Sequence, residues 1–156
     1  MSDQPGICLI INNKKFFNFE TRIGSEKDVE MFETLFKKIN YEVIIEEDLG
    51  HDQFLYVLEK ISKQEKLKNY DIFVSIIMSH GVSDHVVTSD SEYISYDEIL
   101  NCFSNEHCQH LIDKPKVFIF NCCRSQCGML FGYLIDMINY FNDWKQITFS
   151  RKCSFG

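Results

Sequence analysis

The sequence predicts an α/β protein built on a mostly parallel sheet with helices on both faces. Short apolar runs rich in β-branched residues alternate with segments of helical periodicity from residue 6 to residue 120. Residues 70–78 and 115–120 are apolar at most positions, as parallel strands buried on both faces are. The chain has 156 residues, of which 45% are hydrophobic, so it is about one domain long and can form a packed core.

The amino-terminal half is predicted to alternate strand and helix twice. Strands are expected at residues 6–12 and 41–45, and helices at residues 25–40 and 52–66. Apolar side chains recur at helical spacing in both helical segments. Ser25, with Asp28 three residues later, resembles a capping box that would begin the first helix.

The second half is predicted to add two buried strands with a hairpin between them. Residues 70–78 form the first of these strands and residues 115–120 the second. Residues 85–96 form the expected hairpin, and residues 96–103 a short helix. Strands that alternate with helices in this way indicate βαβ units.

Composition and charge argue against several classes of function. The net charge is −7 and no cluster of Lys and Arg stands out, so a nucleic-acid partner is not expected. The amino terminus has no basic region followed by an apolar segment, and no apolar run reaches the roughly 18 residues of a membrane span. Seven cysteines, an odd number, indicate free thiols in a reducing compartment, the cytoplasm. No C-x-x-C pair occurs, so neither a metal nor a cofactor is expected.

Polar residues follow two of the predicted strands directly. His80 and Gly81 come after residues 70–78, and Asn121, Cys122 and Cys123 come after residues 115–120. Ligands of open α/β sheets bind beyond the carboxyl ends of the strands. If these strands are neighbours, an imidazole and a thiol lie side by side, which is the arrangement for covalent thiol catalysis. A hydrogen-bonded structural histidine and inert packing cysteines remain the alternative interpretation.

These endings and several other segments resemble the large catalytic subunit of caspases. The resemblance includes GICLIINN, R-I-G-S-E-K-D at 22–28, NYEVIIEEDL, SIIMSHG and DKPKVFIFNCCR. All of them occur in the order and with the spacing typical of the family, across residues 6 to about 126. The resemblance implies an α/β caspase fold, and it divides the chain into a domain at 1–127 and a divergent apolar tail at 128–156.

The resemblance also implies roles in peptide-bond cleavage after aspartate. Cys123 matches the nucleophile, and His80 the general acid–base group. Gly81, with the N–H of Cys123, would donate to the oxyanion. Cys122 takes the place of a small alanine and is expected to point the other way, because side chains alternate along a strand.

Two further positions match the pocket that reads the aspartate carboxylate. Arg22 matches the first pocket arginine, whose planar guanidinium binds a carboxylate with two hydrogen bonds. Asn121 replaces the pocket glutamine and is one methylene shorter. The implied substrates are proteins or peptides with Asp before the scissile bond, in apoptosis or other proteolytic signalling.

Two departures leave alternatives open. Ser125 replaces a family glycine, and nothing after Cys127 resembles the family's small subunit. The fold is therefore expected to be incomplete, with residues 115–120 at an unpaired edge and a caspase small subunit or another caspase chain as a partner. The alternative is a non-catalytic homologue or truncated product that binds and regulates a full-length caspase. Metacaspases share the His-Gly and Cys pattern, but Arg22 and the neutral Asn121 favour caspases.

The tail carries many apolar residues at helical spacing. Leu130, Leu134, Met137 and Phe141 follow this spacing. Residues 129–142 are therefore expected to form a helix that covers the exposed edge or docks on a partner. A disordered tail is the alternative.

Overall fold

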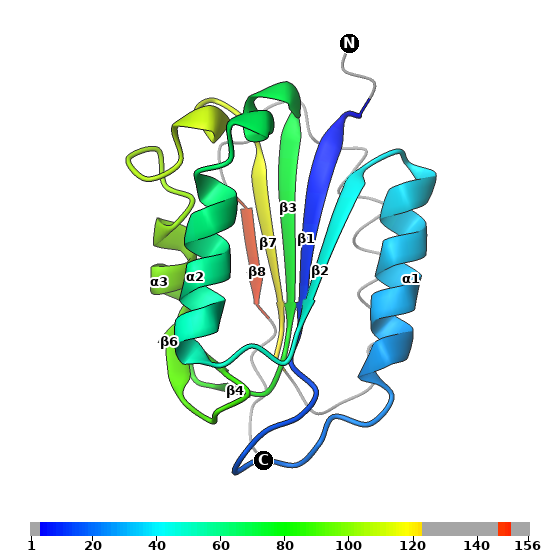
Figure 1. Cartoon of the computed structure of the whole chain (residues 1–156), viewed down its shortest axis with the longest axis vertical. Helices are drawn as coiled ribbons and strands as arrows, with labels where there is room; N and C mark the ends of the chain where they lie inside the picture. Colours follow the sequence, from blue (N-terminus) through cyan, green and yellow to red (C-terminus); the bar gives the residue numbers. More distant parts are fainter. Residues whose placement is uncertain (1–3, 123–146, 151–156) are drawn as a thin grey trace.

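A parallel sheet of five strands forms the centre of the computed structural model, which describes residues 4–122 and 147–150 (Figure 1). Its strands are β1 (Gly6–Asn12), β2 (Glu42–Glu47), β3 (Ile72–Met78), β7 (Lys116–Asn121) and β8 (Ile147–Ser150). They lie in the order β2-β1-β3-β7-β8, and every neighbouring pair is parallel. The predicted α/β class and its mostly parallel sheet are thus confirmed.

Helices cover both faces of this sheet, and a small antiparallel sheet lies beside it. The helices are α1 (Ser25–Lys38), α2 (His51–Ser62), α3 (Tyr96–Asn101) and the 3-10 helices η1 (Glu65–Asn69) and η2 (Gln109–Leu111). The small sheet has the order β4-β5-β6, formed by Gly81–Val82, His85–Val87 and Tyr93–Ser95. The predicted hairpin is the β5–β6 pair. In the described part of the chain, no helix has both the length and the apolar character needed to cross a membrane.

Two apolar clusters follow the two faces of the sheet. On one face, Phe32 and Phe36 of α1 pack against Ile10 of β1 and Ile76 of β3. On the other face, Phe54 and Leu58 of α2 and Phe103, after α3, pack against Phe73 and Phe118. Successive residues of β1, β3 and β7 alternate between the clusters, as a pleated strand requires. We call the first the α1 face and the second the α2 face.

The start of α1 differs from the predicted capping box. Gly24 is the N-cap residue, with φ 86°, and no side chain caps the helix. Ser25 is the first helical residue and is buried, and its Oγ accepts a hydrogen bond from Asn12 Nδ2 at 3.1 Å. The capping box is therefore wrong, because the Ser25 hydroxyl is used to tie α1 to the end of β1.

The expectation that β7 is left at an unpaired edge is also wrong. β8 pairs with β7 in parallel register, from Val117–Ile147 to Phe120–Ser150. An edge strand presents unpaired backbone groups, and Ile, Thr and Phe at 147–149 favour extended backbone. The expected helix at 129–142 lies outside the described residues.

Candidate active site

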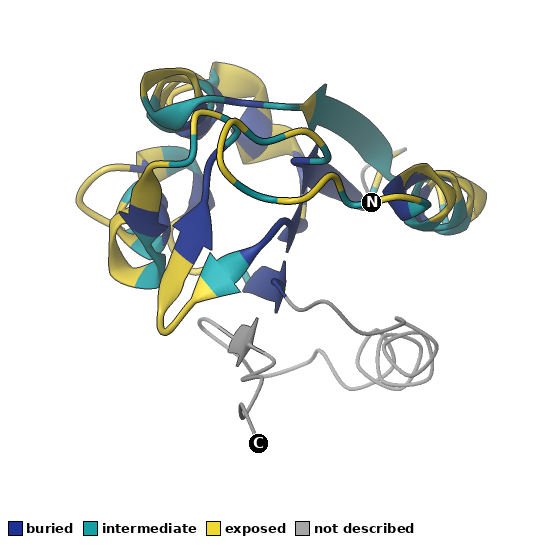
Figure 2. Ribbon diagram, turned by 90° about the horizontal axis from the view of Figure 1, so that it is seen from below, coloured by how far each residue is buried: buried dark blue, intermediate teal, exposed yellow. Residues whose placement is uncertain are grey.

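The carboxyl ends of β3 and β7 meet at one edge of the sheet, and Figure 2 looks onto this edge. The two strands are direct neighbours, and their last registered pair is Met78–Asn121. The N–H of Ser79 donates to the carbonyl of Asn121 at 3.3 Å, so the ladder continues beyond the strands. The prediction that these two strands adjoin is confirmed. His80 therefore lies at the edge where β7 ends.

The loop of residues 13–24, which connects β1 to α1, contacts the ring of His80. This ring is buried, with 8% of the residue exposed, and Nε2 lies 2.7 Å from the carbonyl oxygen of Glu20. A carbonyl can only accept, so Nε2 carries the proton and donates. In the neutral ring Nδ1 is then the nitrogen that can take up a proton. The contribution of Glu20 could not be predicted, since a backbone carbonyl leaves no signature in the sequence.

Gly81 follows His80 and begins β4. The N–H of Val87 donates to the carbonyl of His80 at 2.9 Å. Antiparallel ladders alternate hydrogen-bonded and non-hydrogen-bonded pairs, so the next pair, Gly81–Val86, is of the second kind. The N–H of Gly81 is thus directed away from β5. This orientation leaves it suited to an oxyanion.

Gly81 also packs closely against the end of β7. A Cβ at position 81 would lie 2.6 Å from the Cβ of Cys122 and 3.0 Å from the Cys122 carbonyl oxygen. Both atoms belong to the strand end and cannot rotate away. The absence of a side chain at residue 81 therefore lets the two strand ends approach each other.

We predict that Gly81→Ala lowers the free energy of unfolding by about 1–3 kcal/mol, as overpacking does. Urea unfolding measures the change. In a Cys122→Gly background the same substitution should cost less, because the nearest clashing atom is gone. An equal cost in both backgrounds would show that the contact with Cys122 does not constrain Gly81.

Cys122 is a packing residue, as expected from the alternation along the strand. It lies on the α2 face with Phe118 and Phe120 and is 7% exposed. Burial raises the pKa of its thiol to about 12, although a hydrogen bond with the Tyr96 side chain partly opposes this. At neutral pH the group is therefore a thiol, which is a poor nucleophile. Cys123, the predicted nucleophile, lies outside the described residues.

The raised pKa of Cys122 predicts a loss of stability in alkali. The unfolded chain loses this proton near pH 8.5, whereas the folded chain keeps it until the pKa of about 12. The unfolded state therefore binds fewer protons above pH 9, and the free energy of unfolding falls as pH rises. Half-buried Tyr41 and buried Tyr70, each with a pKa raised to about 12 mainly by burial, add to this fall above pH 10.

Urea unfolding from pH 8 to pH 11 tests this expectation. Cys122→Ala should make the slope above pH 9 shallower by up to about 1.4 kcal/mol per pH unit, while lowering stability at pH 8. Cys102→Ala is the comparison: that thiol is only half-buried, and although burial raises its pKa as well, a smaller change of slope is expected. Identical slopes for Cys122→Ala and the unchanged protein would contradict the burial of this thiol.

The predicted carboxylate-binding residues lie on the α1 face of the same edge. Arg22 Nη1 donates to Asn12 Oδ1 and to the Asn13 carbonyl, both at 2.9 Å, which holds the guanidinium at the end of β1. Asn12, Met78 and Asn121 lie opposite one another across β1, β3 and β7. The backbones of Asn12 and Asn121 are thus about 10 Å apart. Asn121 continues the alternation of the α1-face residues of β7 and is 3% exposed.

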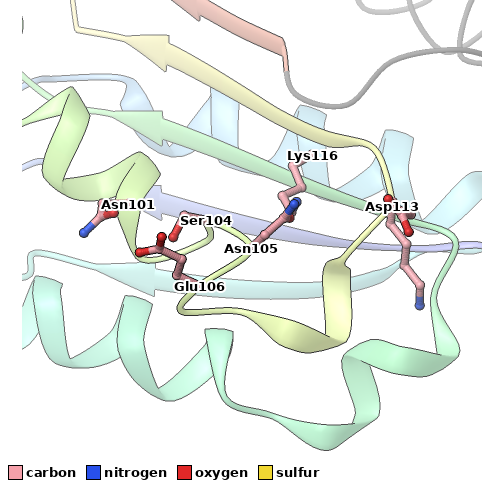
Figure 3. A pocket seen from close by; sticks show the side chains of 7 residues that line it. Asn101, Ser104, Asn105, Glu106, Asp113 and Lys116 are labelled. Atoms are coloured by element: carbon pink, nitrogen blue, oxygen red, sulfur yellow. The ribbon is translucent and has the colours of Figure 1, made fainter.

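A hollow of about 480 Å³ lies at the opposite edge of the sheet, where β7 begins (Figure 3). Its lining is polar and carries both signs of charge: Asn101, Ser104, Asn105, Glu106, Asp113, Lys114 and Lys116. Lys116 Nζ donates to Asn105 Oδ1, and Lys114 Nζ to the carbonyls of Leu67 and Lys68. Both ammonium groups are thus already hydrogen-bonded within the chain. Among the described residues, no group of three or more His, Cys, Asp or Glu could hold a metal ion.

Comparison with known proteins identifies the family to which this chain belongs. The model of the caspase domain matches residues 5–149, which is most of the chain and extends into β8. The chain belongs to the caspase family. Caspase-1 of Canis lupus familiaris is 31% identical over 129 residues, which cover 80% of this chain and 32% of that protein.

Other caspases are similar to the same extent. Caspase-3 of Xenopus laevis is 33% identical over 123 residues, covering 78% of this chain and 43% of that protein. Caspase-3 of Mus musculus is 31% identical over 132 residues, which cover 81% of this chain and 47% of that protein. The chain thus spans about a third to a half of the length of these relatives. Family membership supports a cysteine peptidase of the caspase type.

Proposed function

We propose that this protein is a cysteine endopeptidase that cleaves peptide bonds after aspartate. The observation that carries the proposal is the register of β3 and β7, whose last pair is Met78–Asn121. This register brings His80 to the edge at which β7 ends, and Cys123 is the second residue after Asn121 in the chain. Cys122 is unsuitable as the nucleophile, because it lies on the α2 face with its thiol buried.

The proposed reaction uses these groups in sequence. Nδ1 of His80 accepts the proton of the Cys123 thiol, and the sulfur attacks the backbone carbonyl carbon of the aspartate. The N–H groups of Gly81 and Cys123 stabilise the oxyanion that forms. The imidazolium then protonates the leaving amine, and a water molecule, deprotonated by the imidazole, hydrolyses the thioester.

Arg22 and Asn121 are proposed to read the aspartate side chain. The guanidinium is the charge partner of the carboxylate, and the amide of Asn121 adds a hydrogen bond. The hydrogen bonds from Arg22 to Asn12 and Asn13 limit its freedom before substrate arrives. Substrates are therefore proteins or peptides with aspartate before the scissile bond, cleaved in cytoplasmic signalling such as apoptosis.

The assembly is part of the proposal. We propose that a caspase small subunit or another caspase chain completes the substrate pocket. A second candidate function is binding to a full-length caspase and regulating it without catalysis.

Alkylation tests the assignment of the nucleophile. We expect iodoacetamide at pH 7.5, followed by peptide mapping, to modify Cys123 at least tenfold faster than Cys122, because the thiolate is the reacting form. Faster labelling of Cys122 would overturn the assignment. Fast Cys123 labelling without hydrolysis of aspartyl peptides, together with binding to a full-length caspase, would favour the regulatory function.

A further inference from the structure

The loop of residues 13–24 surrounds His80 with two aromatic rings. The ring centroid of Phe16 lies 4.6 Å from that of His80, with the planes at 49°, and that of Phe19 lies 5.6 Å away, at 30°. The two phenyl rings also contact each other edge to face, at 6.2 Å. These distances are typical of aromatic pairs that attract one another. The imidazole thus belongs to a cluster of three rings, which we call the His80 cradle.

The same short segment supplies the hydrogen bond to the imidazole. Glu20, whose carbonyl accepts from Nε2, follows Phe19 directly. Residues 16–20 therefore constrain the ring plane through the two phenyl rings and the protonated nitrogen through the carbonyl. Rotation of the imidazole by 180° about its Cβ–Cγ bond would keep the ring plane but remove Nε2–H from this carbonyl. The intermediate angles would turn the ring out of the plane that Phe16 and Phe19 hold.

Hydrogen bonds to other segments hold this loop in place. The N–H groups of Lys14 and Lys15 donate to Asp48 Oδ1 at 2.7 and 2.8 Å. The N–H of Phe17 donates to the carbonyl of Ser89 at 3.0 Å, and that of Asn18 to Ser91 Oγ at 2.8 Å. Residues 17 and 18, which lie between Phe16 and Phe19, thus anchor the backbone that carries both phenyl rings.

We propose that Phe16 and Phe19 are positioning residues, which hold the imidazole of His80 in a single orientation with the proton on Nε2. This inference rests on the proposed function, in which the other ring nitrogen, Nδ1, accepts the proton of Cys123. Neither phenyl ring carries a group that reacts. Each acts through the imidazole, whose placement governs proton transfer, and a misplacement of about 1 Å can cost roughly a hundredfold in rate.

Phe17 provides a matched control in the same loop. Its residue is 85% exposed, and no aromatic contact of its ring occurs among the described residues. Phe17→Ala therefore removes the same side chain from the same loop without changing the cradle. Leucine at positions 16 and 19 keeps apolar volume but loses the flat ring, so it replaces the alanine variants if these do not fold.

Nitrogen NMR of ¹⁵N-histidine-labelled protein reads the orientation directly, with the signals of His80 assigned by their loss in His80→Gln. We expect a single Nε2–H tautomer in the unchanged protein and in Phe17→Ala, and a mixture in Phe16→Ala and Phe19→Ala. The rate of Cys123 alkylation should fall roughly tenfold in each cradle variant and change less than twofold in Phe17→Ala. Phe16→Tyr, which keeps the ring, should restore most of the rate.

The two readouts separate this inference from the proposed function. An unchanged single tautomer in folded Phe16→Ala and Phe19→Ala proteins would overturn the cradle. If Phe17→Ala changes the tautomer as much as Phe16→Ala and Phe19→Ala do, the proposed role of the cradle is also overturned. A mixed tautomer with an unchanged alkylation rate would uphold the cradle and count against the Cys123–His80 pair.

Discussion

His80→Ala is expected to lower kcat/KM for hydrolysis of aspartyl peptides by about 10²- to 10⁴-fold, the usual contribution of a general acid–base group. The structure places this imidazole at the carboxyl edge with Nε2 bound to the Glu20 carbonyl, so Nδ1 is the nitrogen that can accept a proton in the neutral ring. In the proposed mechanism, the loss of this group prevents deprotonation of the Cys123 thiol and protonation of the leaving amine. Release of a fluorescent amine from a peptide with aspartate at the cleaved position measures the loss.

His107→Ala is the matched control for this experiment. His107 is exposed and bonds to Ser104, in the segment that lines the hollow at the opposite edge of the sheet. Its removal should leave both hydrolysis and alkylation of Cys123 within twofold of the unchanged protein. Alkylation of Cys123 gives a second measurement that does not depend on hydrolysis. If both rates are unaffected in His80→Ala, His80 has no part in the reaction.

Arg22→Ala is expected to reduce kcat/KM for aspartyl peptides by about a hundredfold or more, mainly through KM. The buried carboxylate of the substrate would lose its charge partner, and an unpaired buried charge binds poorly. The kcat/KM of Arg22→Lys should lie between those of the unchanged protein and Arg22→Ala, because lysine keeps the charge but not the planar guanidinium. For peptides with Asn in place of Asp, Arg22→Ala should lower kcat/KM only slightly. The ratio of kcat/KM for Asp and Asn peptides therefore measures the role of the guanidinium directly.

Removal of Arg22 also leaves Asn12 Oδ1 and the Asn13 carbonyl without their donor. Urea unfolding of each variant therefore accompanies the kinetics, and a modest loss of stability of about 1–3 kcal/mol is expected. An unchanged Asp preference in folded Arg22→Ala protein would rule out this role. A preference for Lys or Arg at the cleaved position would instead indicate specificity of the metacaspase kind.

Much of the candidate site could be predicted because it depends on the order of strands and their ends. Residues 72–78 and 116–121 form parallel strands, so the polar residues that follow them had to meet at one edge once the strands adjoined. The alternation of side chains likewise predicted that Cys122 points away from its neighbours in the chain. These properties follow from periodicity along the backbone, which is local.

Other contacts of the site could not be predicted, because they join backbone atoms or distant loops. The group of Glu20 that binds His80 is its backbone carbonyl, which every residue type carries. The Ser25 hydroxyl was predicted to form a local capping box with Asp28, but it accepts a hydrogen bond from Asn12 of β1 instead. The strand at 147–150 is short and lies far along the chain from β7, so its pairing has no local signal.

The sequence by itself determined the α/β class, the order of the four long strands and the main helices from residue 6 to residue 121, and the presence of His-Gly and Cys residues at strand ends. These depend on hydrophobic periodicity and on the residue types that interrupt it. Only the tertiary structure decided that Cys122 is buried against Phe118 and Phe120, that Gly81 lies against Cys122, and that Phe16, Phe19 and Glu20 enclose His80. The physical reason is that burial, and the contacts of a loop with a strand end, depend on how segments distant in sequence pack together.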